Sequence, residues 1–275
     1  MMDIFLGVNI DHIATLRQAR GTRYPSLIDA AKICESSGAD SITLHLREDR
    51  RHIQDQDVEE LKFSLTTKMN LEMAATDEML EIATKILPED CCLVPEKRQE
   101  LTTEGGLDVL SQLGRIKEVC SELSTNNIKA SLFIDPDNYQ IEAAVECGAP
   151  IIEIHTGHYA DASSAAEMQK ELQKISEACA YAHSLGLQVN AGHGLTLENT
   201  KAIAEITPIF FCKDGNEIPF LTEIYQGPKA AGNGKVVPAE GLSFSYTSTI
   251  PYQKSMTEGE VKVRILVKMG TKDPE

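Results

Sequence analysis

The stretch Ser41-Ile-Thr-Leu-His-Leu-Arg-Glu-Asp-Arg-Arg-His52 decides which fold the sequence predicts. It starts as an alternating apolar run, typical of a buried strand, and it ends in a cluster of histidines, arginines and acids. In α/β folds the ligand binds at the carboxyl ends of the strands, where this cluster would lie. Its three arginines offer forks of donors to a phosphate or carboxylate, and its histidines can transfer protons near neutral pH. A solvated loop closed by internal salt bridges is an equally good interpretation.

Outward from this stretch, strand-like and helix-like segments alternate along the chain. The strand candidates are Ile4–Ile10, Asp40–Leu46, Met69–Met73, Cys91–Val94, Lys129–Ile134, Ile151–Ile154 and Leu187–Ala191. Helical patterns lie near Ser26–Ser37, Gln56–Thr66, Thr76–Leu87, Leu107–Thr125, Asn138–Cys147, Ser163–Ser184 and Thr196–Glu205. Seven βα units with short connections predict an α/β fold of the (β/α)8 TIM-barrel class, with a doubly wound open sheet as the alternative. The sequence contains neither a GxGxxG after its first strand nor a Walker A motif, so we expect no dinucleotide or P-loop site.

The composition changes after residue 206. Six of the eleven prolines and none of the seven histidines fall in the last 70 residues, whose pattern leans towards turns and strands. Ile209–Cys212 is the candidate for an eighth strand. We therefore expect a barrel domain over residues 1–206 and an atypical C-terminal segment over 207–275.

Charge and cysteine usage limit the possible partners. A net charge of -16 argues against nucleic acid or an anionic membrane surface as partner. The apolar runs are too short for a membrane span, and the N-terminus lacks the cationic start of a signal peptide. The seven cysteines are scattered, with no CxxC pair, which favours reduced thiols in a cytoplasmic protein. An anionic substrate would need a local cluster of arginines.

Other predicted strands also end in ionisable or amide side chains. The clearest such ends are Asn9-Ile-Asp-His12, Asn70-Leu-Glu72, Pro95-Glu-Lys-Arg-Gln99, Glu153-Ile-His-Thr-Gly-His158 and Asn190-Ala-Gly-His-Gly194. Because the carboxyl ends of barrel strands share one face, so many polar ends indicate a catalytic barrel mouth.

These motifs, together with His45–His52 and Thr102-Thr-Glu-Gly-Gly106, closely resemble the pyridoxine 5′-phosphate synthase family over about residues 4–206. The resemblance implies a transferase of vitamin B6 biosynthesis that condenses 1-deoxy-D-xylulose 5-phosphate with 3-amino-2-oxopropyl phosphate, without metal or organic cofactor. It also implies a homo-oligomer, an octamer in the family, whose partners are two small phosphorylated substrates.

The resemblance further implies a role for each matching residue. His45 and Glu72 would be proton acceptors, His193 a proton donor, and Glu153 a stabiliser of cationic intermediates. The ligands of the amino-ketone phosphate would be Asn9, Arg20 and the backbone of Gly192. The deoxyxylulose phosphate would be bound by Asp11, His12, Arg47, His52 and Thr102.

Other interpretations remain open at this point. Glu153, His155, His158 and His193 are possible metal ligands, and Cys91-Cys92 could be a redox pair, although two buried small residues suit that position better. The family ends its barrel with a phosphate-binding Gly-His pair, whereas Ile209-Phe-Phe-Cys-Lys-Asp-Gly-Asn216 contains none. The alternative functions are a catalytically impaired barrel that binds deoxyxylulose phosphate without turnover, and a different phosphosugar lyase or isomerase.

Overall fold

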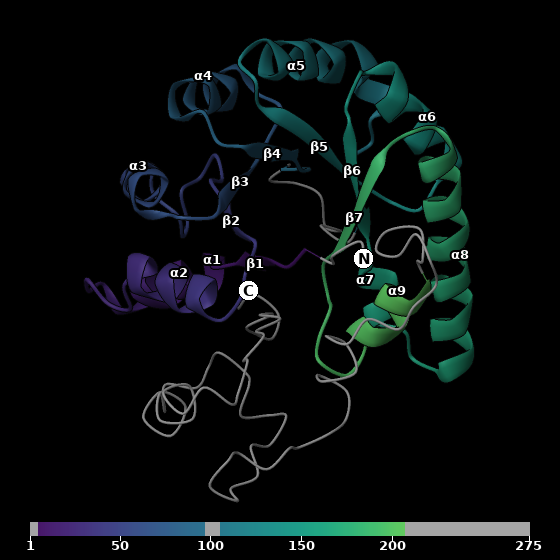
Figure 1. Cartoon of the computed structure of the whole chain (residues 1–275), viewed down its shortest axis with the longest axis horizontal. Coiled ribbons are helices and arrows are strands. Elements are labelled where there is room, and N and C mark those ends of the chain that lie inside the picture. The colour runs from purple at the N-terminus through teal and green to yellow at the C-terminus, as the bar shows by residue number, and fades with distance from the viewer. Residues whose placement is uncertain (1–4, 97–104, 207–275) are drawn as a thin grey trace, which may run out of the picture.

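The computed structural model describes residues 5–96 and 105–206 (Figure 1). Its strands are β1 (Gly7–Asn9), β2 (Ser41–His45), β3 (Lys68–Met73), β4 (Asp90–Leu93), β5 (Lys129–Ile134), β6 (Ile151–His155) and β7 (Gln188–Gly192). Its helices are α1 (Asp11–Arg20), α2 (Leu27–Ser36), α3 (Asp55–Ser64), α4 (Asp77–Ile86), α5 (Leu113–Thr125), α6 (Asn138–Glu146), α7 (Gly157–Ala160), α8 (Ala165–Ser184) and α9 (Thr200–Ile206), with a 3-10 turn, η1, at Leu110–Gln112.

The strands form one parallel sheet in the order β1-β2-β3-β4-β5-β6-β7. The sheet curls around a common axis, and α2 to α6 and α8 lie on its outside (Figure 1). A doubly wound sheet would reverse its strand order, so this sequential order confirms the barrel class. The eighth strand candidate, Ile209–Cys212, and the rest of 207–275 lie outside the described residues, as does Thr102.

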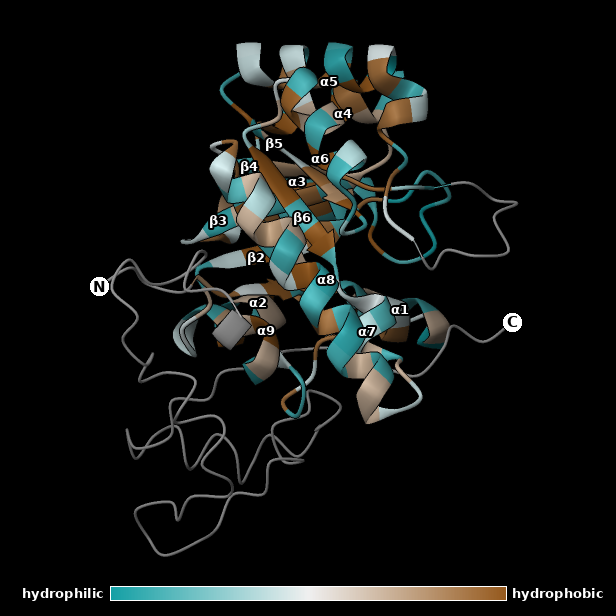
Figure 2. Ribbon diagram, turned by 90° about the vertical axis from the view of Figure 1, so that its right-hand side faces the viewer, coloured by the Kyte–Doolittle hydropathy of each residue, from teal (hydrophilic) through white to brown (hydrophobic). Residues whose placement is uncertain are grey.

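The hydrophobic core lies between the strands and the surrounding helices. Ile42 and Leu44 of β2 are fully buried, and so are Val58 and Leu61 of α3. Figure 2 shows the hydrophobic residues concentrated on the strands and the inner helix faces, with hydrophilic residues outside. Truncating one such side chain to alanine typically costs about 2–5 kcal/mol, so this layer holds the strand ends in place.

Alternate residues of the same strands carry polar groups to the concave side of the sheet. In the β2–β3 register Thr43 lies opposite Asn70 and His45 opposite Glu72. The amide of Asn70 donates to Thr43 Oγ1 over 3.3 Å. Side chains alternate between the two faces of a strand. The pattern that buries Leu44 against the outer helices therefore places His45 and Glu72 on the concave side of the sheet, at the carboxyl ends of their strands.

One helix differs from the sequence prediction. Residues 11–20 are not among the predicted helices, but they form α1. Asp11 lies in its first turn and Arg17 and Arg20 in its last, which suits the helix dipole, and Gly21 ends it with a left-handed φ of 59°. Because this helix has a polar surface and few hydrophobic residues, the apolar periodicity of the sequence did not predict it.

The described cysteines are buried free thiols: Cys34, Cys91, Cys92, Cys120, Cys147 and Cys179. Vicinal Cys91 and Cys92 therefore pack as small buried residues in β4, which is the interpretation that the sequence favours. Among the helices of 5–96 and 105–206, none is both long and apolar enough to cross a membrane.

Candidate active site

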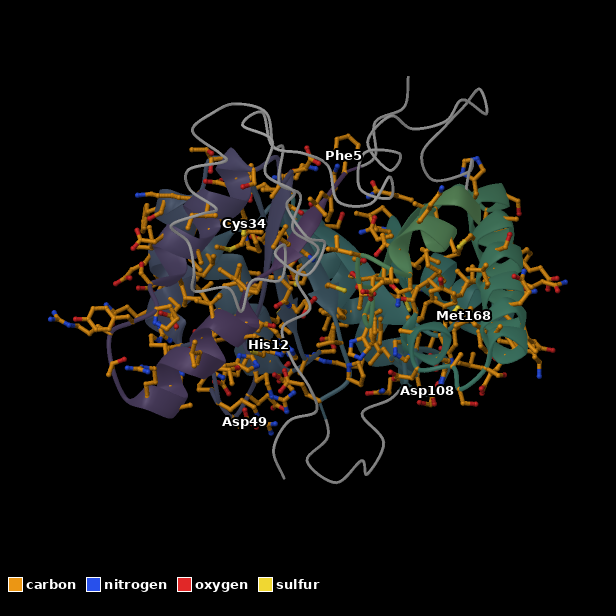
Figure 3. The ribbon with its side chains drawn as sticks, turned by 90° about the horizontal axis from the view of Figure 1, so that it is seen from below. Phe5, His12, Cys34, Asp49, Asp108 and Met168 are labelled. Carbon is orange, nitrogen blue, oxygen red and sulfur yellow. The ribbon has the colours of Figure 1, made fainter. Side chains whose placement is uncertain are left out.

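The loops that follow the strands gather on one side of the molecule. In Figure 3, His12, Asp49 and Asp108 lie on the side opposite Phe5, which precedes β1. These three residues follow β1, β2 and β4 respectively. Because the sheet is parallel, the described polar strand ends share one barrel mouth.

His45 lies at the centre of the first cluster in this mouth. Its Nε2 is 2.6 Å from Glu96 Oε1, and its Nδ1 is 3.9 Å from Glu72 Oε2. Its backbone N–H donates to Asp11 Oδ1 over 2.7 Å. The His45 imidazole thus lies between two carboxyl groups, an arrangement suited to proton transfer.

Asn9 holds Asp11 in position. The Asn9 amide donates to Asp11 Oδ2 over 2.8 Å, while the backbone N–H of Asp11 donates to Asn9 Oδ1 over 2.8 Å. One carboxylate oxygen of Asp11, one ring nitrogen of His45 and one carboxylate oxygen of Glu72 all lie within 4.8 Å of one another. Three residues that the resemblance singled out are therefore brought together.

Two carboxyl groups in the mouth are shifted towards their protonated forms. Burial raises the pKa of Glu72 well above its ordinary value, and the charges of Asp11 and Glu153 act in the same direction. Burial raises the pKa of Glu153 to about 7, although His155 and the thiol of Cys92 act in the opposite direction. Before substrate binds, burial therefore favours the protonated form of Glu72, while Glu153 titrates near neutral pH.

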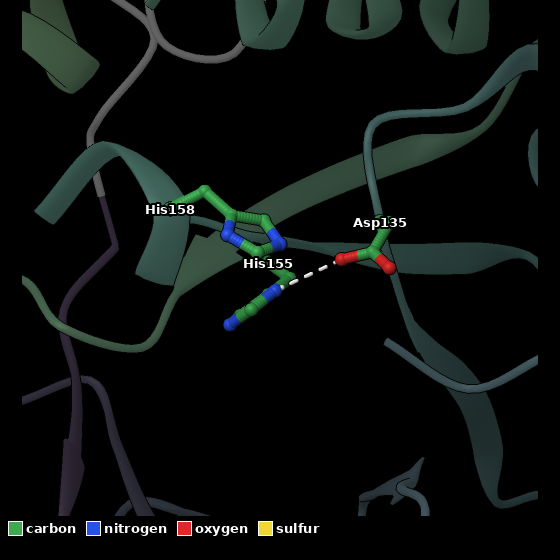
Figure 4. A group of neighbouring side chains, drawn as sticks. All are labelled: Asp135, His155 and His158. Atoms are coloured by element: carbon green, nitrogen blue, oxygen red, sulfur yellow. Dashed lines mark hydrogen bonds and ion pairs between the residues drawn. The ribbon is translucent and has the colours of Figure 1, made fainter. Parts of the chain in front are cut away.

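The second cluster is built on β5 and β6 and is rich in rings (Figure 4). His155 is 3% exposed, and its Nδ1 is 2.9 Å from Asp135 Oδ1. The His155 ring lies 5.1 Å from that of His193 and 5.4 Å from that of His158, centroid to centroid. Phe133 packs against it at 5.2 Å. The ring of His193 therefore packs against the aromatic and imidazole rings of this cluster.

Glycines bring the second cluster close to Glu153. A Cβ on Gly192 would lie 2.4 Å from Glu153 Oε1, and one on Gly157 would lie 2.4 Å from His155 Nε2. His193 itself has a φ of 77°, in the left-handed region that favours glycine. The backbone of β7 can thus approach the carboxylate only because no side chain intervenes.

The arginines of the opening stretch are largely engaged with the protein itself. Arg50 binds the carboxylates of Asp55 and Glu78, and Arg51 binds Asp49. Arg47 contacts Asp49 at 3.3 Å, a long distance that leaves it the best placed of the three for an anion. The interpretation as a loop with internal salt bridges is therefore correct for Arg51, whose partner Asp49 lies in the same stretch, whereas the carboxylate partners of Arg50 lie outside it.

Two further predicted binding residues, His52 and His12, lie near the first cluster. The ring of His52 is 6.1 Å from that of His45, and burial lowers the pKa of His52 below its ordinary value. Its Nδ1 accepts the N–H of Ile53, which fixes the ring. His12 is in the first turn of α1, whereas Arg20 is exposed at the last. A phosphate bound by Arg20 would thus lie at the rim.

Possible metal ligands converge differently from the sequence interpretation. His155 and His158 are joined by Asp135, with potential ligand atoms within 4.8 Å, while Glu153 lies against Cys92 Sγ at 3.9 Å. The 2.9 Å contact between Asp135 and His155 is a hydrogen-bond distance, so it needs no ion between the two groups.

Sequence reasoning missed Glu96, Asp135 and His155 as parts of the site. Glu96 was one charge among several in Pro95–Gln99, and His155 was considered only as a metal ligand. Asp135 directly follows β5, and this position at a strand's carboxyl end was the signal that could have found it. Their importance lies in pairing across strands, which a single sequence does not display.

A curled parallel sheet with outer helices, and with carboxyl and imidazole groups facing one another at its mouth, defines an α/β-barrel enzyme built for general acid–base chemistry.

The comparisons with known proteins then identify the family. A family model described as "Pyridoxal phosphate biosynthesis protein PdxJ" matches residues 6–218. The chain is 59% identical over 218 residues to a pyridoxine 5′-phosphate synthase of Photobacterium profundum, covering 79% of this chain and 90% of that one. A protein of the same name from Coxiella burnetii is 59% identical over 213 residues, 78% of this chain and 89% of that one. The chain belongs to this family.

The family match reaches twelve residues beyond the expected limit at 206, into the region where the sequence departs from the Gly-His pattern. Among solved structures, a thiamine phosphate pyrophosphorylase from Pyrococcus furiosus shares 11% identity at a TM-score of 0.48, over 74% of this chain and 81% of that one.

Proposed function

We propose that this chain condenses 1-deoxy-D-xylulose 5-phosphate with 3-amino-2-oxopropyl phosphate to give pyridoxine 5′-phosphate, phosphate and water. The observation that carries the proposal is the cluster of Asp11, His45 and Glu72, which this chain builds while sharing 59% identity with synthases over most of their length. The reaction joins an amine to two ketones and needs repeated proton transfer, for which imidazole and carboxyl groups with perturbed pKa values are suited.

His45 and Glu72 act as proton acceptors in this proposal, and His193 as the proton donor. The raised pKa of Glu72 favours its protonated form before substrate binds. A cationic carbinolamine or iminium between Glu72 and Glu153 would favour both carboxylates, because an opposite charge stabilises the ionised form. Formation of the cation would therefore turn Glu72 into a base and Glu153 into the stabilising counter-charge.

The two phosphates are assigned to different sides of the mouth. Deoxyxylulose phosphate would be bound by Arg47, His52, Asp11, His12 and Thr102. The amino-ketone phosphate would be bound by Asn9, Arg20 and the backbone of Gly192. Gly192 supports this assignment, because its bare backbone lies beside Glu153 where a second substrate would meet the first. Residues 1–206 would form the catalytic barrel, and 207–275 a segment that includes its last strand.

The test is a turnover assay with both substrates, monitoring phosphate release and pyridoxine 5′-phosphate by chromatography. We expect equal amounts of both products, dependent on both substrates. Binding of deoxyxylulose phosphate without turnover would instead support the impaired barrel, which the family match through residue 218 does not favour. Cytoplasmic location and assembly into a homo-octamer stay predictions, the latter testable by light scattering.

A further inference from the structure

Glu96 is a buried carboxylate that has none of the catalytic or binding roles proposed above. It follows β4 and its side chain is 2% exposed. One oxygen, Oε1, is 2.6 Å from His45 Nε2, and the other, Oε2, accepts the backbone N–H of Glu48 over 2.9 Å. Both oxygens are therefore committed, and the side chain links the loop after β2 to the loop after β4, across the end of β3.

These contacts decide which nitrogen of His45 carries the proton. A neutral imidazole has one donor and one acceptor nitrogen, and its tautomer is set by the stronger partner. Burial alone would raise the pKa of Glu96, but the hydrogen bonds from His45 and from the Glu48 N–H lower it below its ordinary value. An ionised Glu96 accepts a hydrogen bond and cannot donate one, so the proton resides on Nε2.

The other ring nitrogen of His45, Nδ1, faces a carboxyl group whose pKa is shifted in the opposite direction from that of Glu96. Nδ1 of His45 is 3.9 Å from Glu72 Oε2, and Glu72 is the group whose pKa burial raises. Nε2 of His45 thus faces the Glu96 carboxylate, and Nδ1 faces the carboxyl group whose protonated form burial favours. The 3.9 Å gap exceeds a hydrogen bond and would be closed by rotation of the Glu72 carboxyl or by one water.

We propose that Glu96 is a positioning residue for His45, holding its imidazole in the Nε2–H tautomer so that Nδ1 exchanges a proton with Glu72. In the forward step the O–H bond of the Glu72 carboxyl breaks and an N–H bond forms at Nδ1. The products are the Glu72 carboxylate and an imidazolium whose Nε2–H stays bound to Glu96. The reverse step returns the proton to Glu72, and no other reactant is consumed.

The tautomer of His45 is independent of the proposed function, whereas its effect on turnover rests on it. The decisive variant is Glu96→Gln in the full chain, because the amide keeps the shape and can still accept the Glu48 N–H. Its NH2 would then face His45 Nε2 as a donor and reverse the preferred tautomer. We expect ¹⁵N spectra of the assigned imidazole nitrogens to show Nε2–H in the wild type and a shift towards Nδ1–H in Glu96→Gln.

The matched control is Glu89→Gln, just before the start of the same strand. Glu89 also accepts a backbone N–H, from Met69 over 2.9 Å, and it binds the ammonium of Lys62 at 2.5 Å where Glu96 binds an imidazole. Its loss reports the structural cost of removing such a carboxylate. We expect Glu96→Gln to lower kcat about 10²-fold and to shift the pH–rate profile, whereas Glu89→Gln leaves both unchanged.

Several results would overturn the proposal. An unchanged His45 tautomer and pH profile in Glu96→Gln would do so, as would an equal loss of kcat in Glu89→Gln. If Glu96→Gln fails to fold, Glu96→Asp takes its place, and retention of the Nε2–H tautomer with partial kcat is then expected. A wild type without turnover but with the predicted tautomer shift would refute the proposed function and leave the positioning role of Glu96 standing.

Discussion

The two halves of the barrel mouth are built on different physical principles. On the β1–β4 side, directed hydrogen bonds fix individual atoms, as in Asn9 to Asp11, Asp11 to the His45 N–H, and Glu96 to the His45 ring. On the β5–β7 side, rings pack at centroid distances of 5.1–5.4 Å, and glycine lets the backbone approach Glu153. The first side is defined mainly by charge and hydrogen bonds, and the second mainly by shape, although it also holds the proposed proton donor His193 and the titrating Glu153. Substitutions that alter charge and those that alter volume should therefore affect the two sides differently.

The largest effect is expected from changing charge on the β1–β4 side. Glu72→Gln keeps the volume of the side chain and resembles the neutral form that burial favours, but it removes basicity. We expect turnover to fall about 10³-fold while the free energy of unfolding at pH 7 is maintained. His45→Asn should abolish product formation in the same way. Steady-state kinetics with urea denaturation checks both, and near-normal turnover in either variant would refute the assigned roles.

Glu153 connects the two halves, and its raised pKa predicts that the free energy of unfolding depends on pH. Its pKa of about 7 in the folded state lies above its ordinary value, so the folded state binds more protons between about pH 4.5 and 7. This contribution is fully present below about pH 4.5 and is lost as the pH rises through about 7, by at most about 3 kcal/mol. Glu72 acts in the same direction.

Urea denaturation at pH 5 and pH 8 measures this loss in the wild type and in Glu153→Gln. The variant should lose less stability between the two pH values, because its amide does not titrate. Identical pH dependence in the two proteins would show that Glu153 is ionised in the fold at both values.

The sequence predicted the barrel well, because seven alternating segments and their polar ends are local features. It also named His45, Glu72 and Asp11, which the structure brings within 4.8 Å. It did not predict α1, whose residues lack a strong apolar face. Nor did it predict that Arg50 would pair with Asp55 and Glu78, which lie in the first turns of α3 and α4.

The missed site residues follow the same physical logic. Glu96 is 51 positions from His45, and Asp135 is 20 from His155. Periodicity and motif spacing describe neighbours along the chain, whereas Asp135 meets His155 through the register of β5 and β6, and Glu96 reaches His45 across the end of β3. The functional carboxylate–imidazole contacts therefore emerge only from the packed barrel.

A change of volume on the β5–β7 side comes next in expected size. Gly192→Ala places a Cβ 2.4 Å from Glu153 Oε1, so the carboxyl group or β7 must move. We expect a loss of about 10² in kcat/KM, because small misplacement of a reacting group is costly. The control is Gly114→Ala in α5, whose Cβ would meet nothing within 4 Å and should raise stability by at most about 1 kcal/mol. Equal kinetics in both variants would contradict a role for shape at Gly192.

The smallest effect is expected from changing charge on the β5–β7 side. Asp135→Asn keeps the shape but removes the carboxylate that lies 2.9 Å from His155 Nδ1. Burial alone would raise the pKa of Asp135, yet the hydrogen bonds from His155 and the Gly106 N–H lower it below its ordinary value. Its stabilising contribution is therefore present above about pH 4 and lost as the pH falls through the folded pKa, and the variant should be less stable at pH 7 by about 1 kcal/mol.

The kinetic effect of Asp135→Asn should be only about tenfold in kcat, because the ring of His155 packs against that of His193 at a centroid distance of 5.1 Å and this packing survives the substitution. Side-by-side assays with Glu96→Gln across pH 6–9 make the comparison direct. If the two variants lose equal activity and shift the pH profile alike, both halves control protonation, and the distinction between a charge-defined and a shape-defined half is wrong. If Asp135→Asn alters KM more than the pH profile, the imidazole of His155 serves as a wall that orients His193.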